Sequence, residues 1–376
     1  VLARTPGAPP GTKGISLFIV PKFIPTDGGA PGERNSLHCV SIEHKLGING
    51  SPTCVLAFEE ATGWIVGEEN AGMRYMFTMM NDARIHVGLE GMGLAERSYQ
   101  QALEFANTRR QGRAVGAAKT DSSLIVEHPD VRRMLLTMRA FIEGARALLF
   151  ANTAAIDRSH HAPDEATRAA GEERAALLTP VSKAFATDLG VELTSIGVQI
   201  HGGMGFVEET GSAQHFRDAR ITPIYEGTNG IQAMDLVMRK LPLRGGGVVA
   251  EYFGEIADTV QATAAAGLTD ISAALDSARS DLEAATDHLA DLENPNDALA
   301  GATPYCRLFG LVACGHYLGR QAVVAAKSAD DPWMQEKIAV ANFYATQLLP
   351  QTRGLVPAVT AGAQQLFDVS LAAAGT

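Results

Sequence analysis

The sequence predicts a mainly α-helical protein with a small β part: a partial β domain, then a four-helix bundle, then an additional C-terminal helical domain. Hydrophobic residues make up 46% of the 376 residues but aromatic residues only 6%, and Ala and Leu dominate long segments, which favours close-packed helices. Only residues 1–62 show the alternation and turn spacing of strands. The predicted domains are therefore 1–62, 63–242 and 248–376.

Three strands are predicted in the N-terminal part, at residues 16–20, 37–43 and 53–58, with Gly- and Pro-rich turns between them. Three strands do not close a stable sheet by themselves. The chain also begins without Met and enters a strand almost at once. We therefore expect the sequence to be a fragment whose preceding strands are missing.

Helical periodicity begins near Gly72 and continues almost to the C-terminal end. The predicted helices cover 73–106, 129–159, 164–197, a segment from Thr228 onward, 270–292, 304–328 and 332–349. The lengths of the first four suit a four-helix bundle. Residues 243–247, Leu-Arg-Gly-Gly-Gly, are the clearest linker.

Composition restricts the partners and the compartment. With 31 basic and 42 acidic residues the net charge is −11, so neither nucleic acid nor an anionic membrane is expected as the main partner. We find no apolar run long enough for stable membrane insertion and no signal segment, which predicts a cytoplasmic protein. The cysteines lack CxxC or metal-ligand spacing, so reduced thiols and no metal site are expected.

One short segment, residues 223–232 (Pro-Ile-Tyr-Glu-Gly-Thr-Asn-Gly-Ile-Gln), concentrates chemically useful groups. Its single carboxylate, Glu226, stands beside glycine at the start of a predicted helix and is a candidate general base. Upstream, residues 199–206 (Gln-Ile-His-Gly-Gly-Met-Gly-Phe) form a second glycine-rich turn, whose N–H groups can approach a phosphate. Taken singly, such a Glu is usually a helix-capping residue and a Gly-Gly pair usually only turns the chain.

Together the two segments resemble the acyl-CoA dehydrogenase family, in which a Tyr-Glu-Gly-Thr loop carries the catalytic base and a Gln-x-x-Gly-Gly-x-Gly turn cradles FAD. The resemblance covers most of the first two-thirds of the chain. Residues 45–53 and 79–84 resemble one subgroup, which has an extra C-terminal helical domain and includes 3-methylmercaptopropionyl-CoA and long-chain acyl-CoA dehydrogenases. The resemblance implies that an N-terminal helical domain and half of the β domain are missing.

The resemblance implies α,β-dehydrogenation of an acyl-CoA to the trans-2-enoyl-CoA, with electrons passed to an electron-transferring flavoprotein. It also implies a homodimer or homotetramer. Glu226 would remove the α proton, and its backbone N–H would bind the thioester carbonyl. Tyr225 and Gly227 would line the acyl channel. Asn81 and Arg84 fall near the Asp-x-x-Arg position that contacts CoA in the family, although Asn stands first here.

The implied FAD contacts come from three segments. Residues 105–111 resemble a stretch that binds the FAD of a neighbouring subunit, which nominates Arg109 and Gln111, although Gly112-Arg113 stands here where the family has Phe-Gly. The other candidates are Gln199, Gly202, Gly203, Thr228 and Gly230. From the residues alone, a solvated basic helix end is the preferred interpretation of Arg109. His201 is expected to have a packing or turn role.

Two alternative functions stay open. An acyl-CoA oxidase would use the same base but let dioxygen reach the flavin. A non-catalytic relative with the same fold would act as a scaffold or bind nucleic acid, and the acidic charge and the Glu226 loop argue against it.

Overall fold

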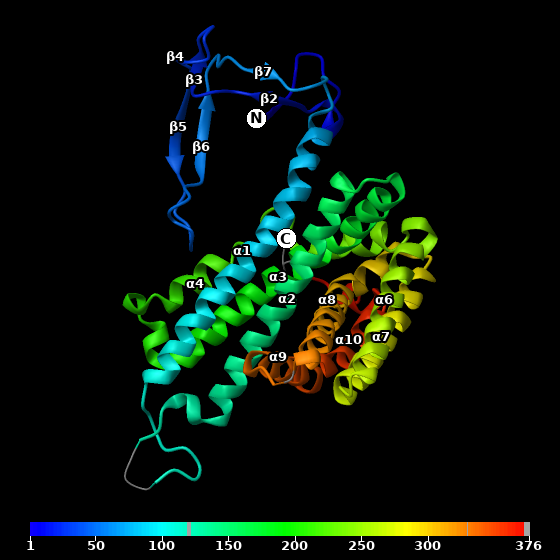
Figure 1. Ribbon diagram of the computed structural model, residues 1–376. Coiled ribbons are helices and arrows are strands. Elements are labelled where there is room, and N and C mark those ends of the chain that lie inside the picture. The colour runs from blue at the N-terminus through cyan, green and yellow to red at the C-terminus, as the bar shows by residue number, and fades with distance from the viewer. Residues whose placement is uncertain (119–121, 329, 372–376) are drawn as a thin grey trace. The chain divides into compact units, whose positions relative to one another are not determined.

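The computed structural model describes residues 1–118, 122–328 and 330–371. It divides into two compact units, Val1–Arg84 and Ile85–Thr376. Helices form most of the described chain and the strands are few and short, so the predicted fold class is confirmed (Figure 1). The division between the units falls inside helix α1, Gly72–Thr108, whereas the domain boundaries drawn from the sequence stay a prediction.

The first unit contains every strand in the described ranges. The strands are β1 Leu2–Ala3, β2 Ser16–Ile19, β3 Phe23–Pro25, β4 Pro31–Arg34, β5 Leu37–Ile42, β6 Cys54–Phe58 and β7 Trp64–Ile65. They form small antiparallel sheets in the orders β1-β2-β7, β3-β4 and β5-β6. The three predicted strands are all present, as β2, β5 and β6.

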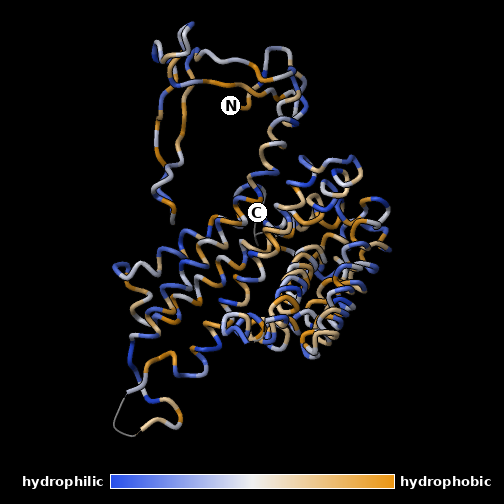
Figure 2. The backbone as a smooth tube through the Cα atoms, viewed as in Figure 1, coloured by the Kyte–Doolittle hydropathy of each residue, from blue (hydrophilic) through white to orange (hydrophobic). Residues whose placement is uncertain are grey.

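The longest ladder, β5–β6, pairs Leu37 with Phe58 and Ile42 with Cys54, with an irregularity between Cys39 and Ser41. Apolar side chains of this ladder are exposed, including Val40 at 61%. Figure 2 colours parts of these two strands as hydrophobic. A two-stranded ribbon has no second layer against which such residues could pack.

The second unit is helical. After α1 come α2 Pro129–His161, α3 Glu165–His201, α4 Ser212–Ala219, α5 Asn229–Asp235, α6 Gly247–Ala265, α7 Thr269–Ala290, α8 Pro295–Ala325, α9 Pro332–Phe343, α10 Thr352–Thr360 and α11 Gln364–Phe367. Short π-helical segments, Leu236–Lys240 and Tyr344–Leu348, continue α5 and α9. No helix in the described ranges is both long and apolar enough to cross a bilayer.

The sequence misplaced the start of one helix and missed others. Helix α8 begins at Pro295 and not at Pro304, because the Asn294 side chain accepts a hydrogen bond from Asn296 N (3.0 Å) and Pro suits the first helical turn. Helices α6, α10 and α11 were not predicted individually, although their region was expected to be helical, and helix α4 was not predicted at all. It is a short amphipathic helix of eight residues, too brief for the periodicity to stand out.

The core of the second unit runs without a break from the bundle into the C-terminal helices. Helix α8 packs against α2, α3 and α5 and also against α6, α7, α9 and α10. Arg307 of α8 makes two hydrogen bonds to Glu192 of α3 (2.8 and 2.9 Å), and its guanidinium lies over the Phe185 ring. The predicted linker, residues 243–247, is a tight turn with left-handed backbone at Arg244 and Gly245.

Candidate functional site

The loop that carries Glu226 has a constrained backbone. Glu226 has a φ of 55° and Gly227 a φ of 82°. Positive φ is uncommon for residues other than glycine and persists only where the surroundings hold it. The backbone N–H of Asn229 closes the loop by donating to Pro223 O (3.0 Å). The fully buried Gln232 donates to the carbonyl oxygens of Glu226 (3.4 Å) and Gly227 (3.3 Å).

Helices α1 and α3 cross closely where this loop is attached. A β-carbon on Gly190 of α3 would lie 2.8 Å from the carbonyl oxygen of Gly91 of α1, so only glycine fits at this contact. Glu90, next to Gly91, accepts a hydrogen bond from the Tyr225 hydroxyl. Burial, then the bond to Glu90, then the negative charges of Glu90 and Glu226 raise the pKa of Tyr225 well above its usual value. Glu90 was not predicted as a site residue, because it belongs to no motif.

Asn229 attaches the other side of the loop to α3. Its Oδ1 accepts from Nζ of Lys183 (2.8 Å), a fully buried side chain. Its Nδ2 donates to Asp188 Oδ1 (2.7 Å), Thr187 Oγ1 (2.9 Å) and Ala184 O (3.1 Å). Burial raises the pKa of Asp188, and the bond from Asn229 opposes this shift. Asn229 was also missed as a site residue, although it lies inside the motif.

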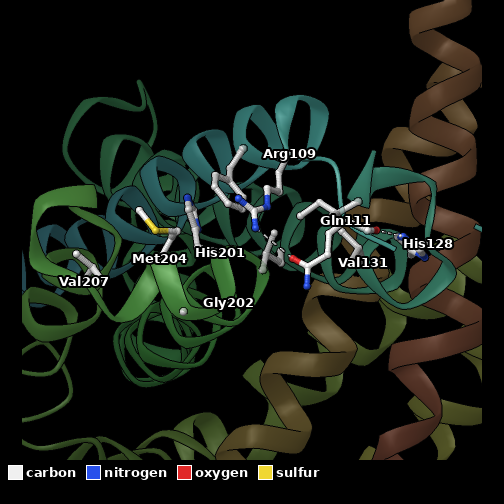
Figure 3. A pocket seen from close by; sticks show the side chains of 12 residues that line it. Arg109, Gln111, His128, Val131, His201, Gly202, Met204 and Val207 are labelled. Atoms are coloured by element: carbon white, nitrogen blue, oxygen red, sulfur yellow. Dashed lines mark hydrogen bonds between the residues drawn. The ribbon is translucent and has the colours of Figure 1, made fainter. Parts of the chain in front are cut away.

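A separate cavity of about 660 Å³ brings together four of the predicted FAD-binding residues: Arg109, Gln111, Gly202 and Gly203 (Figure 3). Arg109 and Gln111 lie in the segment just after α1, and Arg109 Nη2 donates to Gln111 Oε1 (3.4 Å). Gly202 has a φ of 60°, and a β-carbon on Gly202 or Gly203 would meet open space. Main-chain atoms of this turn are therefore accessible to a ligand.

Two histidines contribute to the wall of this cavity. His201 is buried, donates through Nδ1 to Gly197 O (2.7 Å) and stacks on Phe105 with ring centroids 4.6 Å apart. Its contacts are those of a packing residue. His128, which precedes α2, lies with Nε2 3.0 Å from the carbonyl oxygen of Gln111 and so holds the Arg109–Gln111 turn in place. No sequence motif pointed to His128.

Other predicted site residues lie elsewhere. Gln199 is exposed and is not among the described residues that line the cavity. Thr228 and Gly230 belong to the Glu226 loop, where the Thr228 hydroxyl caps α5 by accepting from Ile231 N (3.4 Å). Asn81 and Arg84 belong to the first unit, where Arg84 Nη1 donates to Asn81 Oδ1 (3.2 Å). The roles of all these residues stay predictions.

Two family models match the chain. The model "Acyl-CoA dehydrogenase, C-terminal domain" matches residues 70–241, and "Acetyl-CoA dehydrogenase C-terminal like" matches residues 252–370. The chain is 47% identical to 3-methylmercaptopropionyl-CoA dehydrogenase of Ruegeria pomeroyi, over 99% of this chain and 64% of that protein. It is 35% identical to the broad-specificity linear acyl-CoA dehydrogenase FadE5 of Mycobacterium tuberculosis, over 93% of this chain and 61% of that protein.

Solved structures share the fold. ACDH-11 of Caenorhabditis elegans in complex with C11-CoA matches with a TM-score of 0.74 at 23% identity, over 90% of this chain and 54% of that chain. An acyl-CoA dehydrogenase of Bacillus anthracis complexed with FAD matches with a TM-score of 0.74 at 19% identity, over 96% of this chain and 60% of that chain. The chain thus spans less than two-thirds of the curated relatives and of these structures. Its sequence matches along nearly its whole length place it in the acyl-CoA dehydrogenase family.

Proposed function

We propose that this chain is part of an FAD-dependent acyl-CoA dehydrogenase that converts an acyl-CoA thioester to the trans-2-enoyl-CoA, with Glu226 as the base. The observation that carries the proposal is the Glu226 loop. It combines the family motif with a half-buried carboxylate on strained backbone, attached to α1 through Tyr225 and to α3 through Asn229. The similar proteins of Ruegeria pomeroyi and Mycobacterium tuberculosis are both named acyl-CoA dehydrogenases.

The cavity of about 660 Å³ fits a phosphate-bearing cofactor such as FAD. The open main chain at Gly202 and Gly203 lets a diphosphate approach closely, Arg109 supplies a cation and Gln111 an amide. When bound, FAD supplies the acceptor for a hydride. Gln199, Thr228 and Gly230 are proposed to complete the FAD contacts. The FAD that Arg109 and Gln111 contact is proposed to be that of a neighbouring subunit.

In the proposed reaction the Glu226 carboxylate accepts the α proton of the acyl group, the β hydrogen leaves as a hydride, and the double bond forms between these carbons. The Tyr225 hydroxyl donates its one proton to Glu90, so it does not compete for the Glu226 carboxylate. The backbone N–H of Glu226 is proposed to bind the thioester carbonyl, where negative charge develops. Tyr225 and Gly227 would shape the acyl channel, and Asn81 and Arg84 would contact CoA.

The proposed electron acceptor is an electron-transferring flavoprotein, and the proposed assembly is a homo-oligomer. An acyl-CoA oxidase remains the second candidate function, because the same base and cofactor serve it. Peroxide produced from acyl-CoA without an added acceptor would identify the oxidase. A salt-sensitive shift of duplex DNA would instead support the nucleic-acid-binding alternative.

The test is the anaerobic visible spectrum of the purified chain, supplied with FAD, before and after addition of an acyl-CoA. We expect the flavin band to bleach. Glu226→Gln should keep the flavin band and ligand-induced spectral shifts but lose the bleaching, whereas the exposed control Glu209→Gln should bleach as the parent does. Bleaching that survives in Glu226→Gln would show that another group is the base.

A further inference from the structure

We propose that Asn229 is a positioning residue for Glu226: its side-chain amide connects Lys183 and Asp188 of α3 and thereby holds the Glu226 loop in its left-handed conformation. The catalytic part of this inference rests on the proposed function. The structural part does not, because it concerns only the geometry of the loop. Neither Lys183 nor Asp188 belongs to a motif, and Asn229 makes the bonds through atoms that the proposed reaction does not use.

The polarity of the Asn229 amide matches its surroundings. Its carbonyl oxygen faces the Lys183 ammonium at 2.8 Å and its NH₂ group faces the Asp188 carboxylate at 2.7 Å. The opposite orientation would place NH₂ against the cation and oxygen against the anion. Hydrogen bonds to charged groups are stronger than neutral ones, and those of buried groups are costly to lose. The two charges therefore select one orientation of one residue type.

The hydrogen bonds of Asn229 constrain Glu226 through the backbone of the loop. Asn229 begins α5, and its own N–H donates to Pro223 O (3.0 Å), so fixing Asn229 fixes both ends of the loop. One helical turn later, Gln232 donates to Glu226 O (3.4 Å) and Gly227 O (3.3 Å). A non-glycine residue with a φ of 55° needs such outside support, because its own preference is for negative φ.

Other side chains at position 229 would not reproduce this arrangement. Aspartate would set a carboxylate oxygen against Asp188, alanine would remove the bonds to both charged groups, and serine could reach only part of the network. An exchange of the two groups should work: in the double variant Asp188→Asn with Asn229→Asp, the new carboxylate accepts from Lys183 and from the new amide at position 188. This exchange keeps the two charges and the size of the groups, and it gives up the bonds from Asn229 Nδ2 to Ala184 O and Thr187 Oγ1.

Hydrogen–deuterium exchange of the whole chain, read by mass spectrometry on peptides covering 221–232, is the first measurement. We expect Asn229→Asp to speed exchange in this segment by roughly tenfold or more, with α2 peptides unchanged, because each 1.4 kcal/mol of lost local stability is tenfold in opening. The double variant should return most of the way to the parent value, because it restores the bonds among positions 183, 188 and 229 but not the bond to Ala184 O. Asn342→Asp, an exposed site on α9, is the matched control. If Asn229→Asp does not fold, Asn229→Ser takes its place.

The second measurement is the rate of flavin bleaching by acyl-CoA in the same variants, loaded with FAD. A displaced base should lower the maximal rate by roughly 100-fold with little change in the acyl-CoA concentration at half-maximum, and the double variant should restore it. Unchanged exchange at 221–232 in Asn229→Asp, or in Asn229→Ser, would overturn the inference. So would a double variant that exchanges as fast as the single one. Failure of the parent chain to bleach would leave this inference standing, because the exchange measurement does not depend on the proposed function.

Discussion

Gly190 of α3 and Gly91 of α1 meet backbone to backbone: a β-carbon on Gly190 would lie 2.8 Å from the Gly91 oxygen and 3.0 Å from its Cα. This contact fixes how closely the two helices approach. On either side of it stand the groups that hold the Glu226 loop, Glu90 on α1 and Asp188 on α3.

Gly190→Ala should therefore destabilise the fold by about 1–3 kcal/mol, because backbone and not a flexible side chain must move. Gly93→Ala is the matched control on α1, since a β-carbon there meets nothing within 4 Å. It should stabilise by up to about 1 kcal/mol through helix propensity. Urea unfolding monitored by circular dichroism measures the free energy of unfolding of both variants. If Gly190→Ala and Gly93→Ala change it in the same direction, the close contact at Gly190 is contradicted.

The Tyr225–Glu90 hydrogen bond should appear as a coupling energy. Tyr225→Phe leaves the half-buried Glu90 carboxylate without this donor and should cost about 1–3 kcal/mol, whereas Glu90→Gln keeps an acceptor and should cost less. The double variant should lose less free energy of unfolding than the two single variants lose together, and the difference, the coupling energy, should be about 0.5–3 kcal/mol. Additive costs in urea unfolding would mean that the bond contributes nothing.

The contact between Tyr225 and Glu90 should also shift the ionisation of Tyr225 to higher pH. Burial and the neighbouring carboxylates raise the pKa of Tyr225, so its phenol stays protonated at a pH where an exposed tyrosine ionises. The difference in 295 nm absorbance between the parent and Tyr225→Phe should remain near zero through about pH 10. A normal titration step in that difference would contradict the assignment.

His316 on α8 should make stability depend on pH. It is 1% exposed, and neither ring nitrogen has a hydrogen-bond partner among the described residues. Burial, and then the charge of Arg320, lower the pKa of His316 to about 4. The unfolded chain takes up this proton near pH 6.5 and the folded chain does not, so stability falls as the pH drops from 6.5 toward 4.

Because the pKa of His316 falls from 6.5 to about 4, the free energy of unfolding should decrease by about 3 kcal/mol over this pH range. This decrease should be absent in His316→Leu, so the difference in unfolding free energy between parent and variant should change between pH 7 and pH 4.5. Groups elsewhere, such as His215 with its lowered pKa, titrate alike in both proteins and cancel. A difference that is the same at both pH values would place a proton on His316 in the folded chain.

The C-terminal helices should be required for folding of the bundle. A chain ending at Leu241 loses α8 and with it the Arg307 guanidinium, which lies over Phe141 and Phe185, both at most 3% exposed in the second unit. We expect it to bind a hydrophobic dye and to unfold without a cooperative transition. A chain ending at Gln364 loses most of α11, which has no buried residue, and should unfold as the parent does. Cooperative unfolding of the shorter chain would make the bundle an independent domain.

Much of this molecule follows from local pattern. The three predicted strands and the long helices were confirmed because their periodicity depends on neighbours within one or two turns. The Glu226 loop and the Gly202–Gly203 turn could be found because each motif is contiguous. The start of α8 was misjudged for a local reason too: Pro304 was read as a helix start, although Asn294 and Pro295 form a better one.

Only the tertiary structure decided how the loop is held. Tyr225 and Glu90 are 135 positions apart, and Asn229 and Lys183 are 46 apart. The spacing of Asn229, Lys183 and Asp188 along the chain does not indicate that their side chains meet. The two glycines at the crossing of α1 and α3 have no sequence feature that distinguishes them from other helix residues. Sequence alone nominated Glu226 as the candidate base and predicted most of the long helices, because propensity and motif are local. The packing of α1 on α3 determined what holds the Glu226 loop in position, because such contacts exist only after the helices have come together.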